Sequence, residues 1–215
     1  MRKHELGLRR PQDIEARSFQ IIADELDVDV DPGAWPVVRR VIHATADFDF
    51  ARTLVFSDAA VERGVAALAA GATVVCDTTM VAAGINKRVL GGFGGCVRTF
   101  IGDEDVAAEA RERGITRSAV SMERACGLSG PLVFAIGNAP TALVRLCELV
   151  EEGAMRPPEL VVGVPVGFVN VVESKELVLR SNLPAIVARG RKGGSTVAVA
   201  ICNALLYLAS SDRRE

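Results

Sequence analysis

The chain has 215 residues, of which 24% are charged and 49% hydrophobic, and its formal net charge at pH 7 is -2. This composition is typical of a folded protein and excludes an intrinsically disordered chain. The charge balance gives no overall positive field, and aromatic residues make up only 5% of the chain, so no nucleic-acid partner is expected. We expect one domain over residues 1–215, in which residues 1–11 form a polar tail.

The cysteines and the longest apolar run indicate the cellular compartment of the protein. The five cysteines lie far apart and include no C-x-x-C pair, which is the pattern of neither a zinc site nor a disulfide framework. The N-terminal residues do not resemble a signal peptide, and the apolar run over residues 195–210 is too short to span a bilayer. We therefore expect a cytoplasmic protein with reduced thiols, no bound metal and no membrane contact.

The first third of the chain predicts three helices. Apolar residues recur near one face of a helix over residues 12–26, and a turn signal follows at Asp31-Pro32-Gly33. A second helix is expected from about Pro36, where apolar residues again recur at helical spacing. Ser57 is typical of an N-cap, so a third helix is expected to run to Ala70, with Gly71 just beyond its end.

His43 lies on the second of these helices and is the one histidine outside the N-terminal tail. It falls beside Arg39 and Arg40, on the polar flank and not on the apolar stripe. A surface histidine in a charged helix would explain it without any function. Because histidine titrates near neutral pH without perturbation, His43 is also a candidate proton donor or acceptor. Asp47 and Asp49, which follow, either orient a neighbour or form a solvated acidic loop.

From residue 73 onward, short apolar runs alternate with helical stretches. The expected strands are Thr73–Cys76, Val97–Ile101, Leu132–Ile136, Leu160–Val164 and Ala185–Ala188. The expected helices are Glu104–Arg113, Arg117–Cys126, Thr141–Glu152, Val172–Leu179 and Ser195–Leu208. This alternation predicts an α/β fold: a three-layer α/β/α arrangement with a mostly parallel sheet of about five strands, buried on both faces.

Polar and glycine-rich segments follow four of these strands. In open α/β sheets, ligands bind beyond the carboxyl ends of the strands. We call the four segments together the carboxyl edge, and they span residues 77–80, 137–142, 165–176 and 190–195. Their coincidence at one edge predicts a ligand site there.

The segment from Gly190 to Ser195 has two cations beside two glycines at the start of a helix, which suits a carboxylate or a phosphate. It lacks the spacing of a P-loop. The segment from Gly137 to Thr141 is either a plain strand-to-helix turn or a helix start that offers backbone N–H groups to an anion. Glu173–Glu176 is either a solvated charge cluster or part of the site.

Single residues add to this pattern. Thr116 is explained as an N-cap, whereas Arg117 is either a surface residue or a ligand contact. Asp77 at a strand end either caps the next turn or belongs to the site. Arg17 and Arg40 are further local cations. Local cations in a chain of negative net charge suit a small polyanionic ligand better than a polymer.

Together these segments resemble the precorrin-8X methylmutase family of cobalamin biosynthesis. Two of them, Gly137–Leu143 and Pro165–Lys175 in this order, are highly specific. The other matching residues run through nearly the whole chain: Arg17-Ser18-Phe19, Arg40 through His43-Ala44, Cys76-Asp77 with Met80-Val81, and Gly190-Arg191 with Gly193-Gly194-Ser195.

The resemblance implies an isomerase that moves a methyl group between adjacent carbons of ring C of a polycarboxylate tetrapyrrole, giving hydrogenobyrinate or cobyrinate. It also implies a homodimer without a separate cofactor, in which His43 is the proton donor or acceptor and Ser18 and Arg40 contact the substrate. We expect further substrate contacts from the matching and neighbouring positions, namely Arg17, Asp77, Met80, Arg117, Asn138, Ser174, Lys175, Arg191, Gly193 and Ser195.

The residues themselves fit such a reaction, because the protein need only protonate the conjugated ring and hold it in a fixed orientation. Two alternatives stay open. One is an α/β enzyme that acts on a phosphorylated small molecule through the helix starts after Gly137 and Gly190. The other is a corrinoid carrier that binds without turnover and does not need His43.

Overall fold

The computed structural model describes residues 10–212, so the predicted polar tail lies outside the described residues as far as residue 9. One sheet has the strand order β1-β6-β5-β4-β2-β3. All neighbouring strands pair in parallel, except that β1 runs antiparallel to β6. The strands are β1 (Leu54–Phe56), β2 (Thr73–Cys76), β3 (Cys96–Arg98), β4 (Leu132–Ile136), β5 (Leu160–Gly163) and β6 (Ala185–Ala188).

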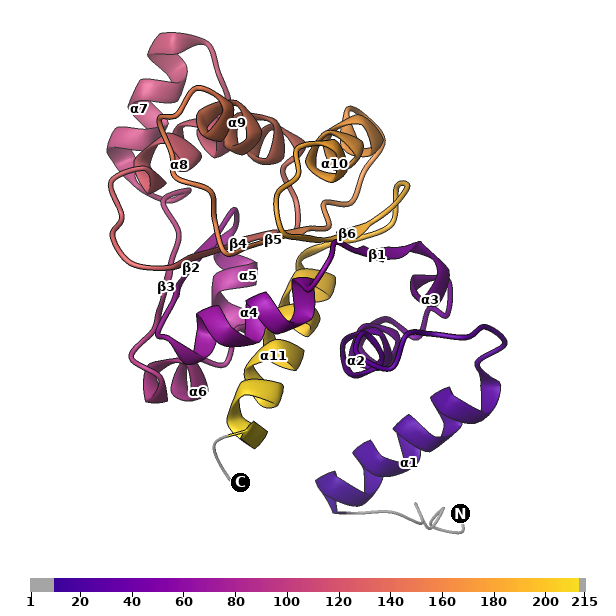
Figure 1. The fold of residues 1–215 in the computed structure, drawn as a ribbon. Helices are drawn as coiled ribbons and strands as arrows, with labels where there is room; N and C mark the ends of the chain where they lie inside the picture. The colour runs from indigo at the N-terminus through magenta and orange to yellow at the C-terminus, as the bar shows by residue number, and fades with distance from the viewer. Residues whose placement is uncertain (1–9, 213–215) are drawn as a thin grey trace, which may run out of the picture.

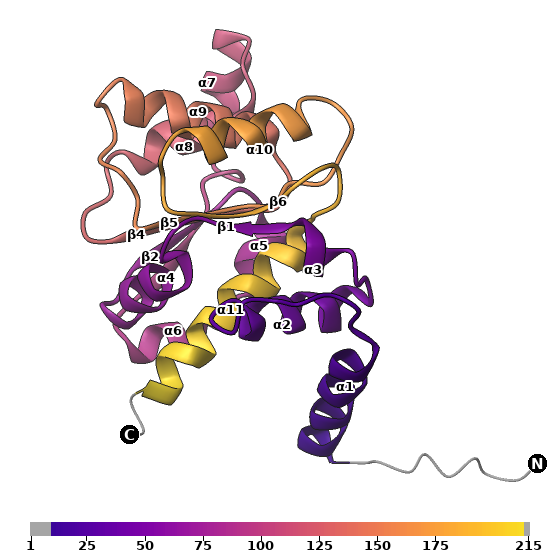
Figure 2. The same ribbon diagram turned by 45° about the vertical axis from the view of Figure 1, so that its right-hand side comes forward.

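Helices cover both faces of this sheet, as Figures 1 and 2 show. One face carries α7 (Glu104–Arg113), α8 (Arg117–Ala125), α9 (Pro140–Glu151) and α10 (Val171–Arg180). The other face carries α2 (Trp35–Thr45), α3 (Phe50–Thr53), α4 (Ala60–Ala69), α5 (Thr79–Gly84), α6 (Lys87–Gly92) and α11 (Ser195–Asp212). In both views α1 (Pro11–Glu25) lies beyond α2, away from the sheet. The expected three-layer α/β/α fold is thus confirmed.

The sheet has one strand more than expected. The strand β1 is only three residues long and follows the short helix α3 directly, so no alternating or apolar pattern of useful length marks it. The strand expected at Val97–Ile101 begins and ends earlier than predicted, and it is not buried on both faces. As β3 it forms the sheet edge, where Cys96 and Arg98 are exposed.

Burial explains why the central strands were recognisable. Every residue of β4, β5 and β6 is buried, because helices cover both faces of these strands. The apolar run at the end of the chain forms α11, which packs against α2 and α4 beneath the sheet. Within residues 10–212, the structure has no helix that is both long and apolar enough to cross a membrane.

One predicted helix start is wrong. The helix α4 begins at Ala60, and the Ser57 hydroxyl instead accepts a hydrogen bond of 2.8 Å from the backbone N–H of Ala185. Ser57 therefore ties the end of β1 to β6 and does not cap a helix. The helix α4 ends at Ala69, one residue before the predicted end. Gly71 lies just beyond it, as predicted, with φ +82°, a left-handed conformation that glycine adopts without strain.

The strand order places the expected site. Because β2, β4, β5 and β6 are parallel neighbours, the four segments that follow them meet at one edge of the sheet. The carboxyl edge predicted from the sequence is therefore a continuous part of the molecule.

Candidate active site

His43 is exposed in the last turn of α2. The opposite side of this helix buries Val38, Val41 and Ile42, and the helix packs against α11. The imidazole ring meets the ring of Phe19 on α1 edge to face, with 5.3 Å between ring centroids and 72° between ring planes. His43 is thus held on a rigid helix and is accessible to a ligand.

Two guanidinium groups lie close to the ring of Phe19, which the histidine also contacts. Those of Arg39 and Arg40 lie 4.7 Å and 5.3 Å from the centroid of the Phe19 ring. Arg40 also lies 4.5 Å from the Tyr207 ring centroid and forms a 2.9 Å ion pair with Glu15. The histidine therefore stands next to two positive charges.

Two further predicted site residues, Arg17 and Ser18, lie on α1. Arg17 is exposed, and the Ser18 hydroxyl is a half-buried group that donates a 2.8 Å hydrogen bond to the carbonyl of Ile14 within the same helix. Since α1 packs against α2, the structure brings Arg17, Ser18, Arg40 and His43 onto one pair of helices.

Asp77 is fully buried at the end of β2 and holds the segment that follows β4. Its carboxylate accepts backbone N–H hydrogen bonds from Gly137 at 3.0 Å, Asn138 at 2.7 Å and Ala139 at 2.8 Å. Burial raises the pKa of Asp77, while the three donors oppose that shift by favouring the charged form. The N–H groups before α9 therefore bind an internal anion, and the Asp77 carboxylate is enclosed within the protein.

Lys175 and Ser174 on α10 are also buried. The Lys175 ammonium donates hydrogen bonds to the carbonyls of Gly190 and Lys192, each at 2.8 Å. Burial lowers the pKa of Lys175 to about 8. The Ser174 hydroxyl donates to the carbonyl of Val171 at 3.0 Å. The segment is therefore not a solvated charge cluster, and Lys175 supports the loop before α11 from inside.

That loop packs tightly on the end of β5. Gly194 donates a 2.8 Å backbone hydrogen bond to the carbonyl of Val164, and a Cβ atom at Gly193 would lie 2.2 Å from the same oxygen. Gly193 also has φ +158°, so only glycine fits this position. The Ser195 and Thr78 hydroxyls lie 3.3 Å apart at the start of α11. Gly193 thus has a packing role in this loop.

Lys192 connects this loop to the helix of the histidine. Its ammonium donates to one carboxylate oxygen of Asp47 and one of Asp49, each at 2.7 Å. Both aspartates lie in the linker directly after α2, so they orient a neighbour and are not simply solvated. The carboxyl edge and the C-terminal end of α2 are therefore joined by two ion pairs.

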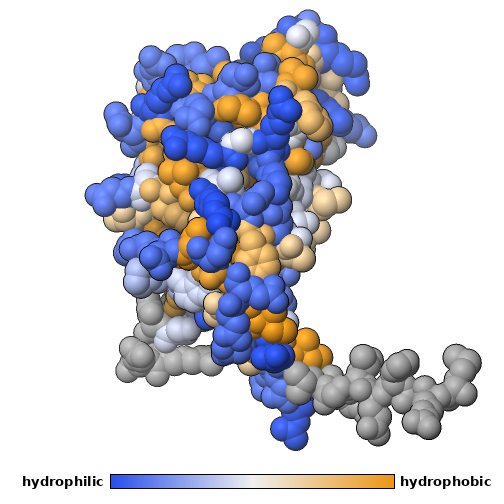
Figure 3. All heavy atoms as spheres, turned by 90° about the vertical axis from the view of Figure 1, so that its right-hand side faces the viewer, coloured by the Kyte–Doolittle hydropathy of each residue, from blue (hydrophilic) through white to orange (hydrophobic). Residues whose placement is uncertain are grey.

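The exposed residues of the carboxyl edge are a mixture of apolar and polar groups. Arg191 and Asn138 are exposed, and the Arg191 guanidinium lies 5.4 Å from the ring centroid of Phe168. Phe168, Val169 and Met80 are 83%, 76% and 68% exposed. Figure 3, which faces the right-hand side of Figure 1, shows a mostly hydrophilic surface on which hydrophobic residues form several separate areas.

Arg117 lies elsewhere. It is exposed at the start of α8, and one guanidinium nitrogen donates to the carbonyl of Ile101 at 3.5 Å. The preceding Thr116 caps α8 as predicted, since its hydroxyl accepts from the N–H of Ala119. Because α8 and α2 cover opposite faces of the sheet, one chain does not bring Arg117 beside His43.

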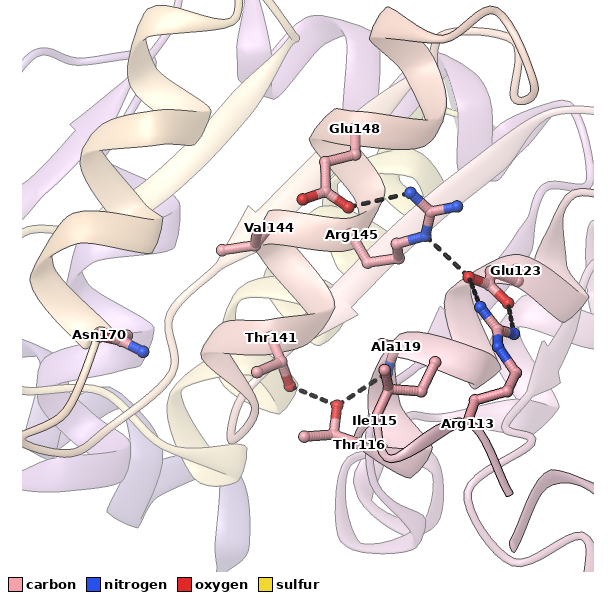
Figure 4. A pocket seen from close by; sticks show the side chains of 10 residues that line it. All are labelled: Arg113, Ile115, Thr116, Ala119, Glu123, Thr141, Val144, Arg145, Glu148 and Asn170. Carbon is pink, nitrogen blue, oxygen red and sulfur yellow. Dashed lines mark hydrogen bonds and ion pairs between the residues drawn. The ribbon is translucent and has the colours of Figure 1, made fainter. Parts of the chain in front are cut away.

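A cavity of about 580 Å³ lies between α8, α9 and the start of α10. Figure 4 shows Thr116 and Thr141 hydrogen-bonded at one end of it, and Arg145 between Glu123 and Glu148 at the other. None of the predicted site residues lines this cavity.

The sequence pattern predicts no role for Phe19, Tyr207 or the aspartates as partners of Lys192. Phe19 belongs to a matching segment, and Asp47 lies four residues after His43, so each carried a weak signal. Nothing in the sequence connects Tyr207 with Arg40, because their contact depends on how α2 crosses α11.

We expect Asp77→Asn to lower the free energy of unfolding by about 1–3 kcal/mol, because an amide cannot accept hydrogen bonds from all three N–H groups that the carboxylate holds. Denaturant unfolding of both proteins measures this. Asp103→Asn is the matched control, since Asp103 is exposed and its side chain makes no cap hydrogen bond. Equal stability of the two variants would contradict the role of Asp77.

Lys175→Met should change how stability depends on pH. An unfolded chain keeps the proton of this lysine up to about pH 10.5, whereas the folded chain loses it near pH 8. As pH rises through this window, wild type should gain stability relative to Lys175→Met, by about 1.4 kcal/mol per pH unit. Below pH 8 the difference should be constant. Unfolding of both proteins between pH 6.5 and 10 measures this, and a difference that is constant throughout would show that the ammonium is not destabilised by burial.

Comparisons with known proteins agree with this architecture. A model of the family described as precorrin-8X methylmutase matches residues 13–208. The chain is 44% identical to the cobalt-precorrin-8 methylmutase of Priestia megaterium, with 94% of this chain and 90% of that protein covered. It is 46% identical to the cobalt-precorrin-8 methylmutase of Salmonella typhimurium, with 93% and 96% covered.

A solved structure extends the likeness to the fold. The precorrin-8X methyl mutase of Thermus thermophilus is similar to this chain with a TM-score of 0.85 and 41% identity, over 93% of this chain and 98% of that one. The resemblance seen in the sequence is thus confirmed, and the chain belongs to the precorrin-8X methylmutase family of isomerases.

Proposed function

We propose that this chain moves a methyl group between adjacent carbons of ring C of a precorrin-8 type tetrapyrrole, with His43 as the proton donor or acceptor. The observation that supports this most is the place of His43: exposed on a rigid helix, beside two cations, and joined to the carboxyl edge through Lys192. The product, hydrogenobyrinate or cobyrinate, has the same atoms as the substrate apart from protons exchanged with the enzyme.

The exposed side chains suit such a substrate. A tetrapyrrole has a broad apolar ring and carboxylates on its periphery, so it needs apolar surface next to positive charge. Met80, Phe168 and Val169 supply the apolar surface, and Arg191 lies on the ring of Phe168. Arg17 and Arg40 supply further positive charge on the side of His43. Bidentate hydrogen bonds from arginine to the carboxylates would fix the ring in place.

The proposed chemistry needs one proton at the right atom. Protonation of the conjugated ring draws electron density away from the carbon that accepts the methyl group, and the methyl migrates to this electron-poor carbon with its bonding electrons. Loss of a proton then restores the neutral conjugated system. General acid–base catalysis of this kind contributes about 10²–10⁴-fold. The rest must come from orientation of the ring, which the carboxylate contacts provide.

We keep the homodimer as part of this proposal, together with a single domain over residues 1–215 and a cytoplasmic location. In support, the helices α8 and α2, which carry Arg117 and His43, cover opposite faces of the sheet, so a second copy of the chain is needed to bring an Arg117 to the side of His43. Sedimentation velocity of the purified protein tests the dimer.

Of the two alternatives, an enzyme acting on a phosphorylated small molecule would have used the N–H groups before α9 to bind the phosphate. These groups already donate to the Asp77 carboxylate, so they do not serve a phosphate. A corrinoid carrier would use the same surface as a mutase but would not need His43. The two are therefore separated by the behaviour of a His43 variant.

We expect His43→Ala to bind precorrin-8X and to lose turnover by about 10²–10⁴-fold. Turnover extends the conjugation of the ring and should appear as a new long-wavelength absorption band. The spectra of wild type and variant are recorded in single-turnover mixtures, first with the metal-free ring and then with the cobalt-bearing ring, since the relatives are named for both.

His4→Gln is the control, because it removes the other histidine of the chain and should retain the band. A band that forms at the same rate with His43→Ala would rule out His43 as the proton donor. If wild type binds both the metal-free and the cobalt-bearing ring and forms the absorption band with neither, the corrinoid carrier is favoured over the mutase.

A further inference from the structure

The imidazole of His43 has few partners. Its ring is exposed, and with residues 10–212 it makes no hydrogen bond or ion pair. Its one ring contact among these residues is the edge-to-face contact with Phe19, at 5.3 Å between centroids. An exposed side chain at the end of a helix can occupy several rotamers. Proton transfer, in contrast, needs the imidazole nitrogen at one place relative to the bound ring.

The ring of Phe19 contacts the two arginines as well as the histidine. The guanidinium of Arg40 lies between two aromatic rings, 5.3 Å from the centroid of Phe19 and 4.5 Å from that of Tyr207. Arg39 lies 4.7 Å from Phe19. The chain has few aromatic residues, eight Phe, one Trp and one Tyr, yet two of them enclose this one arginine. The same ring thus contacts the histidine and both neighbouring cations.

We propose that Phe19 is a positioning residue, which fixes the orientation of the His43 imidazole and its spacing from the Arg40 guanidinium. The inference deepens the proposed function, since it assigns Phe19 a part in the same proton transfer. Edge-to-face and cation–π contacts both depend on the aromatic quadrupole, which an aliphatic side chain of similar volume lacks. Leucine at this position would keep apolar packing and lose the orientation.

A purely structural role would also involve Phe19, because α1 is attached to the rest of the molecule through α2. The buried residue of α1 is Ile22, which is 7% exposed and makes no ring contact with His43. Ile22→Val therefore weakens the attachment of α1 without removing the aromatic ring. It is the matched control for Phe19→Leu.

The test uses the resonances of the His43 ring in the full chain with His4→Gln, which leaves His43 as the sole histidine. In ¹H–¹⁵N and ¹H–¹³C spectra without substrate, Phe19→Leu should move the His43 ring protons toward the shifts of an unstructured histidine, because the ring current of Phe19 is lost. Phe19→Tyr, which keeps the aromatic ring, and Ile22→Val should leave them near their wild-type positions.

Kinetics complete the test. Phe19→Leu should lower kcat by about tenfold with little change in KM, because orientation is lost while the carboxylate contacts remain. Unchanged His43 shifts in Phe19→Leu, or equal changes in Ile22→Val, would overturn the positioning role. That result is independent of the proposed function, which fails instead if His43→Ala turns over normally.

Discussion

Two buried charges hold the loops of the carboxyl edge, and the site depends on them. Parallel strands only bring these loops to one side of the sheet; they do not fix their shape. The Asp77 carboxylate binds three N–H groups ahead of α9, and the Lys175 ammonium binds two carbonyls ahead of α11. A buried charge without partners would be strongly destabilising, so each loop is held close to the geometry that satisfies its charge.

The second half of the site depends on helix packing. Hydrophobic contact with α11 fixes α2, and so places the flank that carries the half-buried Arg40 and the exposed His43. Lys192 then links this helix end to the loop that Lys175 supports. The contacts form a continuous series from α10 through the loop to the linker after α2. A rigid arrangement of this kind is what orientation of a large ring requires.

The sequence was a good guide to the fold where local and tertiary signals agree. The central strands β2, β4 and β6 and the helix α7 have the predicted bounds. Largely buried strands leave a clear apolar run, and an acidic first turn with a glycine after the last turn marks α7. The strand β1 and the helices α3, α5 and α6 are too short to show a period. The sequence predicts the orientation of polar site residues less well. Asp77, Ser174 and Lys175 are predicted to contact the ligand, but their side chains are buried. Their partners are backbone groups of distant loops, which no local pattern reveals.

The most direct test of this account is a crystal structure of the chain with its bound corrinoid product. We predict that the ring lies over the exposed apolar residues of the carboxyl edge, with an imidazole nitrogen of His43 at about 3 Å from it or linked through one water. A ring bound instead in the cavity between α8 and α9, away from His43, would contradict the proposed site and the role of the histidine together.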